Sequence, residues 1–107
     1  MIDSVALKEL REQRFFSGWD GFVSAERVTA SEQLIRSLID AITANGPVAT
    51  VAEVQRCVRE CVARFNELDQ GWILTMERED ICDRLSRIVA FCGMDGSAEW
   101  IADNREW

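Results

Sequence analysis

The chain has 107 residues, a net charge of −7 and 48% hydrophobic residues, a balance that suits one soluble, cytoplasmic domain spanning residues 1–107. The acidic excess argues against nucleic acid as a direct ligand, because phosphate binding depends on clustered lysine and arginine side chains. No apolar run approaches the roughly 20 residues of a membrane-spanning helix, and residues 1–4 lack the features of a signal peptide, so no membrane contact is expected.

The first predicted helix begins at Asp3 or Ser4, either of which can cap it, and runs to about Phe16. The aromatic segment that follows, from Phe15 to Phe22, is interrupted by two glycines that each cost about 1 kcal/mol relative to alanine inside a helix. We therefore expect a broken helix or an ordered loop there. Its aromatic rings should cover the open end of the core.

The second helix is expected to begin at Thr29, because residues 29–32 match the Thr-x-x-Glu pattern of a capping box. Leucine and isoleucine recur at helical spacing up to Ile42, and residues 45–47, Asn-Gly-Pro, form a helix stop. Residues 50–53 form a second capping box only a few residues later. So short a link predicts that the helices before and after it are antiparallel.

The third helix should run from about Val51 to Leu68, with valine, cysteine and phenylalanine on one face and charged residues on the other. A break is expected at Gly71, after which Thr75 should cap a fourth helix that ends at Gly93.

Within the fourth helix, the i,i+4 spacing predicts ion pairs between Asp80 and Arg84 and between Asp83 and Arg87. A short last helix should open near Ser97. Together these elements predict an all-α fold, a single-domain antiparallel bundle of about four to five helices.

The four cysteines all fall at apolar positions of the helical pattern, where free cysteine behaves as a small hydrophobic residue. The chain contains no histidine, the commonest general base and metal ligand, and the cysteines lack the C-x₂-C spacing of a zinc site. We therefore expect core thiols in a reducing compartment, no metal, no cofactor and no enzymatic activity. The cysteines are Cys57, Cys61, Cys82 and Cys92.

Acidic residues are concentrated between positions 67 and 83, where six carboxylates face one arginine. The simpler interpretation is a solvated acidic face. However, Glu79 and Asp83 are like charges at i,i+4 and oppose their own helix, which is easier to understand if a basic protein partner binds them. Trp72 would be an aromatic anchor beside them. The predicted partner-binding residues are Glu67, Asp69, Trp72, Glu77, Glu79, Asp80 and Asp83.

The residues from Phe65 to Leu68, followed by those from Thr75 to Cys82, resemble small acidic α-helical bacterial proteins that act as immunity partners of secreted toxins. The resemblance implies a cytoplasmic, non-enzymatic inhibitor whose acidic patch covers the basic active cleft of a toxin domain. The alternative is a self-associating structural or adaptor protein, a homodimer that uses the aromatic segment from Phe15 to Phe22.

Overall fold

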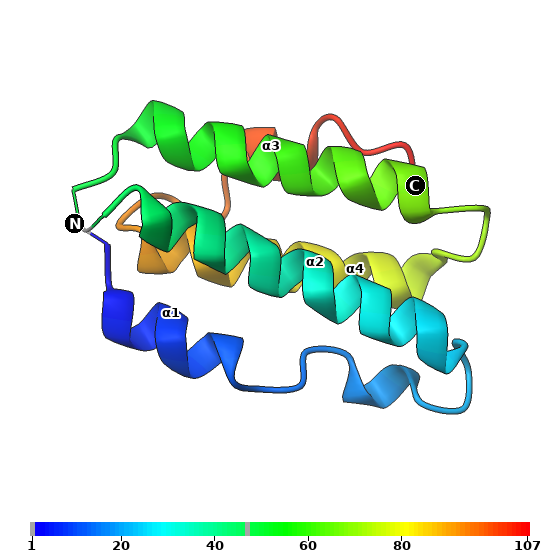
Figure 1. Ribbon diagram of the computed structural model, residues 1–107. Helices are drawn as coiled ribbons and strands as arrows, with labels where there is room; N and C mark the ends of the chain where they lie inside the picture. The colour runs from blue at the N-terminus through cyan, green and yellow to red at the C-terminus, as the bar shows by residue number, and fades with distance from the viewer. Residues whose placement is uncertain (1, 47) are drawn as a thin grey trace.

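The structure, a computed structural model, describes residues 2–46 and 48–107. In this part of the chain α2 packs against α1, α3 and α4, with α1, α2 and α3 side by side and α4 behind α2 (Figure 1). These residues contain no β-strand, so the predicted all-α fold is confirmed. The elements are α1 (Ser4–Arg11), η1 (Ser17–Trp19), α2 (Ala25–Ala44), α3 (Val51–Leu68), α4 (Thr75–Phe91) and η2 (Glu99–Ala102), where η denotes a 3-10 helix.

The first helix is capped as predicted but is shorter than expected. The Asp3 carboxylate accepts a hydrogen bond from the Ala6 N–H at 3.0 Å. The helix ends at Arg11, and beyond it the backbone N–H groups of Phe15 and Phe16 donate to the Glu32 carboxylate at 3.0 and 3.3 Å. A tertiary contact thus replaces the helical hydrogen bonds that would have carried α1 to Phe16.

Most of the aromatic segment belongs to the core, as predicted. Phe15, Phe16 and Trp19 are buried, and the rings of Phe16 and Trp19 stack with centroids 4.1 Å apart. Phe22 differs, since 84% of its surface is exposed. The aromatic patch that self-association would use is therefore reduced to Phe22.

The start of α2 corrects the predicted boundary at Thr29. Its cap is Ser24, whose Oγ accepts a hydrogen bond from the Arg27 N–H at 3.3 Å, so Thr29 lies inside the helix and is exposed. Serine is at least as favourable a cap as threonine, and Ser24 lies five residues earlier. The helix ends before Gly46, at φ +84°, as predicted; Pro47 lies outside the described residues.

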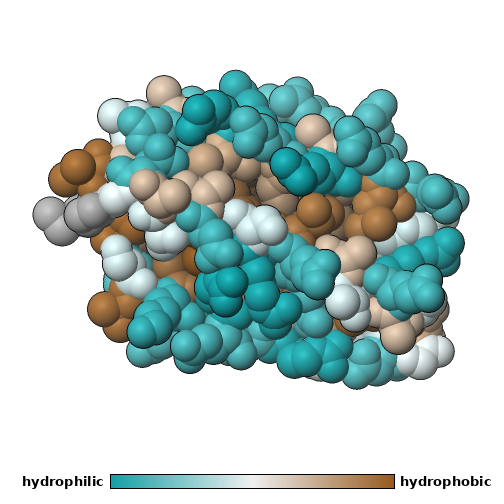
Figure 2. All heavy atoms as spheres, in the orientation of Figure 1, coloured by the Kyte–Doolittle hydropathy of each residue, from teal (hydrophilic) through white to brown (hydrophobic). Residues whose placement is uncertain are grey.

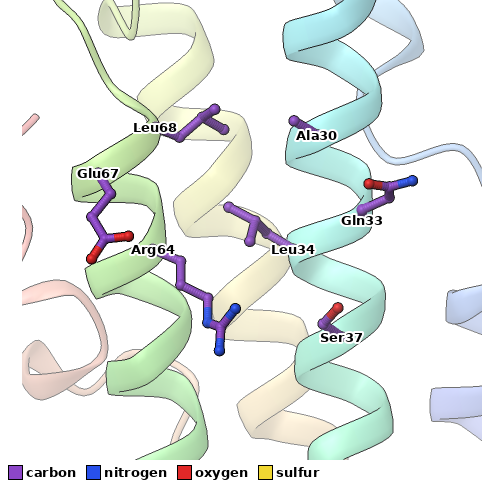
Figure 3. Close-up of a pocket in the computed structure, with 7 residues that line it drawn as sticks. All are labelled: Ala30, Gln33, Leu34, Ser37, Arg64, Glu67 and Leu68. Atoms are coloured by element: carbon purple, nitrogen blue, oxygen red, sulfur yellow. The ribbon is translucent and has the colours of Figure 1, made fainter.

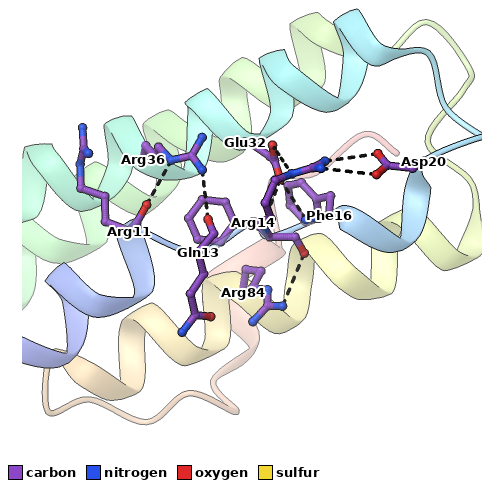
Figure 4. A network of polar contacts seen from close by, with 9 residues as sticks. Arg11, Gln13, Arg14, Phe16, Asp20, Glu32, Arg36 and Arg84 are labelled. Carbon is purple, nitrogen blue, oxygen red and sulfur yellow. Dashed lines mark hydrogen bonds and ion pairs between the residues drawn. The ribbon is translucent and has the colours of Figure 1, made fainter.

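Glu32 is not a capping residue but the centre of a polar network that fastens the segment after α1 to α2 (Figure 4). Its carboxylate is only 6% exposed and also accepts from Arg14 Nε at 3.0 Å. From the same helix, Arg36 donates to the backbone carbonyls of Arg11 and Gln13 at 3.1 and 3.0 Å. Glu32 and Arg36 of α2 thus fix the backbone that leads from α1 into the aromatic segment.

The third helix starts and ends where the pattern predicts, and the fourth differs in its cap. Thr50 Oγ1 accepts the Glu53 N–H at 3.2 Å, and Gly71 adopts φ +90° after α3. The residue that caps α4 is Leu74 rather than Thr75. The Glu77 carboxylate accepts the N–H of Leu74 at 2.9 Å, which is the half of a capping box that needs no polar side chain at the cap.

The last predicted helix is the 3-10 turn η2, which begins at Glu99 rather than near Ser97. The chain then runs along α3, where the Asn66 side chain donates to the carbonyl of Asn104 at 3.0 Å and accepts the N–H of Glu106 at 2.9 Å. These bonds place the ring of Trp107 against Phe65, with centroids 6.0 Å apart. The C-terminal segment therefore covers one side of α3.

We predict that Glu32→Ala lowers the free energy of unfolding by about 2–4 kcal/mol, because it leaves two buried N–H groups without an acceptor. Glu32→Gln, which keeps one acceptor oxygen, should cost less. Urea unfolding followed by circular dichroism measures both. The matched control is Glu9→Ala on the exposed side of α1, which should stay within about 0.5 kcal/mol of wild type; equal effects of the two alanine variants would contradict the assigned role.

The cysteines are free thiols in or beside the core, as expected. Cys57, Cys61 and Cys92 are buried, whereas Cys82 is half-buried. Burial raises the pKa of the Cys61 thiol to about 12 and that of Cys92 to about 11, because a thiolate loses its hydration there. Both groups are therefore protonated and unreactive near neutral pH.

We predict that Ellman's reagent at pH 8 labels at most Cys82 rapidly in the native protein, whereas all four thiols react after unfolding in urea. Because the pKa values of Cys61 and Cys92 are raised, labelling of the native protein should become faster as the pH rises toward these values. Rapid reaction of three or four thiols in the native protein would contradict the burial of these side chains.

Candidate protein-binding surface

The seven residues predicted from the sequence do not form one continuous surface. Glu67 projects from α3 on the side away from α2 (Figure 3), whereas Asp69 and Trp72 lie in the connector before α4. The other four residues belong to α4 but point in different directions, since Glu77 is buried and Glu79 is exposed. The acidic segment therefore contains carboxylates with several distinct roles.

Asp69 and Glu77 are used by the backbone of the connector. The Asp69 carboxylate accepts the N–H groups of Gly71 and Ile73 at 3.0 and 3.2 Å. Glu77 is 6% exposed and holds the N–H of Leu74, as described above. Both carboxylates stabilise the turn that leads into α4, and Glu77 also lies at the helix N-terminus, where negative charge is favourable.

Asp80 is used by the core. Its carboxylate accepts the indole N–H of Trp19 at 2.9 Å, because this fully buried ring needs an acceptor for its one polar group. The predicted pair with Arg84 is not formed. Instead, the Arg84 guanidinium donates to the carbonyl of Phe15 at 3.5 Å. Trp19 and Asp80, distant in sequence, thus join the aromatic segment to α4.

Trp72 is part of the edge of the core. Its indole N–H donates to the carbonyl of Leu68 at 3.1 Å, and its ring meets Trp19 edge-on with centroids 6.0 Å apart. The Arg27 guanidinium lies 5.5 Å from the centre of the Trp72 ring, at the start of α2. Trp72 is half-buried by these contacts, so little of it is free to act as an anchor.

Glu79 and Asp83 are the carboxylates of α4 that face solvent. Asp83 pairs with Arg87 at 3.1 Å, as the i,i+4 spacing predicted, and both side chains are about half exposed. Within residues 2–46 and 48–107, Glu79 has no ion pair. This exposed part of the acidic segment is therefore available to an external cation.

Two exposed apolar side chains at this end of the bundle were not identified from the sequence: Leu74 and Met76, which open α4, are 63% and 44% exposed. Phe22, the end of the aromatic segment named as the alternative interface, is exposed after the buried Trp19. The contacts of Trp19 with Asp80 and Trp72 bring these segments together where α2 begins and α3 ends (Figure 1). We call Phe22, Leu74, Met76, Glu79 and Asp83 the α4 entrance surface.

One signal in the sequence could have identified Met76. The buried residues of α4, such as Ile81 and Leu85, define its apolar face, and Met76 falls outside the helical spacing of that face. An apolar residue on the polar side of a helix indicates an exposed contact. Leu74 gave no such signal, because it lies seven residues before Ile81 and matches the apolar spacing.

We predict that Asp80→Ala lowers the free energy of unfolding by about 1–3 kcal/mol, because it leaves the buried indole N–H of Trp19 unpaired. Tryptophan fluorescence during urea unfolding measures the change and reports the altered surroundings of Trp19. The neighbouring exposed carboxylate supplies the control: Glu79→Ala should change the stability by no more than about 0.5 kcal/mol. A larger cost at Glu79 than at Asp80 would reverse the assignment.

Among residues 2–46 and 48–107, no group of three or more cysteine, aspartate or glutamate side chains is arranged to hold a metal ion. None of the helices in these ranges is both long and apolar enough to cross a membrane. Comparison with known protein families, with curated proteins and with solved structures found no match.

Proposed function

We propose that this protein is a non-enzymatic, cytoplasmic protein-binding module of the immunity type, which neutralises a bacterial toxin domain by covering its basic cleft. The α4 entrance surface would make the contact. The observation that carries the proposal is the hydrogen bond between Trp19 and Asp80, which brings the segment of Phe22 to the start of α4, where apolar side chains and two carboxylates are exposed.

The composition of this surface matches what a tight protein interface requires. Phe22, Leu74 and Met76 supply apolar area that a partner can remove from water, and aromatic side chains and methionine are enriched in interfaces. Glu79 and Asp83 supply negative charge beside them. The combination favours a partner that presents a basic surface with an apolar centre.

The carboxylates that are bonded inside the protein hold the backbone of the α4 entrance surface in place. Asp69 and Glu77 fix the turn that carries Leu74, and Asp80 fixes the position of Trp19, three residues before the exposed Phe22. A surface that is already held in place loses less conformational entropy on binding. Only part of the acidic segment therefore meets the partner, and the rest orients it.

The distribution of charge favours rapid association with a basic protein. Residues 66–107 carry 10 acidic and 4 basic side chains, whereas residues 1–65 carry 9 and 8. Long-range attraction of this kind increases the association rate and weakens as salt is added. Glu79 and Asp83 repel one another on one helix face, and a cationic partner would relieve that repulsion.

We predict that Glu79→Lys combined with Asp83→Lys weakens binding at least 100-fold, the usual scale for reversing desolvated charges at an interface. Phe22→Ser combined with Met76→Ser should weaken it without changing the salt dependence. The probe is the purified product of the gene adjacent to the one that encodes this chain, measured by biolayer interferometry at several ionic strengths. Growth of cells that express this product, with and without each variant, tests neutralisation.

The control is Glu9→Lys combined with Glu12→Lys, which changes the net charge equally at α1 and its C-cap, away from the α4 entrance surface in the sequence. It should leave the affinity nearly unchanged. If both charge reversals reduce binding equally, the attraction is nonspecific and the α4 entrance surface is not the site. If the serine variant converts a dimeric wild type to a monomer, self-association through Phe22 replaces the proposal.

A further inference from the structure

A groove runs between α2 and α3, and α4 lies behind these two helices (Figure 3). Its wider part encloses about 480 Å³. A second part of about 200 Å³ continues between the same two helices and shares Leu34, Ser37 and Arg64 with the first. The groove shares no lining residue with the α4 entrance surface, and the proposed function does not use it.

The floor of the groove is apolar and incompletely covered. Leu34 and Leu68 pack against the core but remain partly exposed, as does Ala41 in the narrower part. Hydrophobic residues gather in a band between the polar ridges of α3 and α2 (Figure 2). Two of the four α2 residues that line the wider part, Ala30 and Ser37, are small and allow another helix to approach closely there.

Two charged side chains at the rim lack ion-pair partners. Arg64 extends from α3 toward Ser37, and Glu67, three residues later on α3, points away from α2 (Figure 3). Within the described ranges, neither residue forms an ion pair, whereas Arg11 is paired with Asp40. One positive and one negative group, side by side on one helix, form a pattern that is complementary to itself after rotation by 180°.

The charge of α3 as a whole also favours a second copy as the occupant. The helix is neutral, with three arginines and three glutamates, although the protein has a net charge of −7. Two copies repel each other at long range because both are negatively charged. The electrostatic cost of their approach is smallest where the facing surfaces are neutral. A strongly acidic or strongly basic partner would match only one of the two rim charges. The charged residues of α3 are Glu53, Arg56, Arg59, Glu60, Arg64 and Glu67.

We propose that the groove between α2 and α3 receives α3 of a second copy of this chain, in a two-fold symmetric dimer. In this dimer Arg64 of each copy pairs with Glu67 of the other, so that two equivalent ion pairs flank the axis. The outward side of each α3 covers the apolar floor of the opposite groove. The dimer contact uses residues of α2 and α3, whereas the α4 entrance surface uses Phe22 and residues 74–83.

Charge reversal with mixing tests the pairing directly. Arg64→Glu should place four glutamates at the interface of its own dimer, and Glu67→Arg four arginines, so each variant alone should dimerise at least tenfold more weakly than wild type. When the two variants are mixed in equal amounts, both ion pairs form again with exchanged partners. The mixture should therefore form a heterodimer with an affinity close to that of the wild-type dimer.

Sedimentation equilibrium over about 1–300 µM, the range of weak to moderate dimers, measures these constants under reducing conditions. Circular dichroism of each variant checks that the fold is intact, and Arg87→Glu on α4 controls for the change in net charge. A wild-type chain that stays monomeric throughout this range overturns the proposal. So does a dimer that both single variants leave unchanged, or a mixture that shows no heterodimer.

Discussion

The buried carboxylate of Glu32 is the contact on which the arrangement of the first third of the chain depends. It accepts the N–H groups of Phe15 and Phe16 and pairs with Arg14, all within the segment that leaves α1. A buried carboxylate is costly unless its oxygens are satisfied, and buried N–H groups are costly unless they find acceptors. Each side therefore requires the other, and their contact determines where α1 ends, which aromatic rings enter the core and where Trp19 meets α4.

The acidic residues between positions 67 and 83 fall into two groups, those bonded inside the protein and those that face solvent. Asp80 completes the burial of Trp19, and Asp69 and Glu77 close the turn before α4, so these carboxylates act inside the protein. Glu79 and Asp83 are left facing solvent, beside apolar side chains that the same turn exposes. An acidic composition thus has two consequences here, a fixed connector and a smaller charged surface that the connector holds in place.

The two proposed interfaces differ in their electrostatics because they lie on different elements. The α4 entrance surface belongs to the acidic half of the chain, so it would attract a basic partner from a distance. The groove between α2 and α3 is bordered by a neutral helix, and its Arg64 and Glu67 favour a partner with the same pattern. In these two proposals, a protein with a net charge of −7 would associate with itself on one face and with a cation-rich surface on another.

The sequence by itself determined the features that depend on neighbours within one turn: the all-α class, the cap at Thr50, the stop at Gly71 and the pair between Asp83 and Arg87. Such signals need only residues three or four positions apart, so the local pattern contains them completely. Only the tertiary structure decided that Glu32 would leave its capping pattern for partners 16–18 residues away, and that Asp80 would bind a ring 61 residues away. Those choices follow from burial, since a carboxylate satisfies the unpaired donors that the folded core brings to it, and a linear pattern does not reveal which donors those will be.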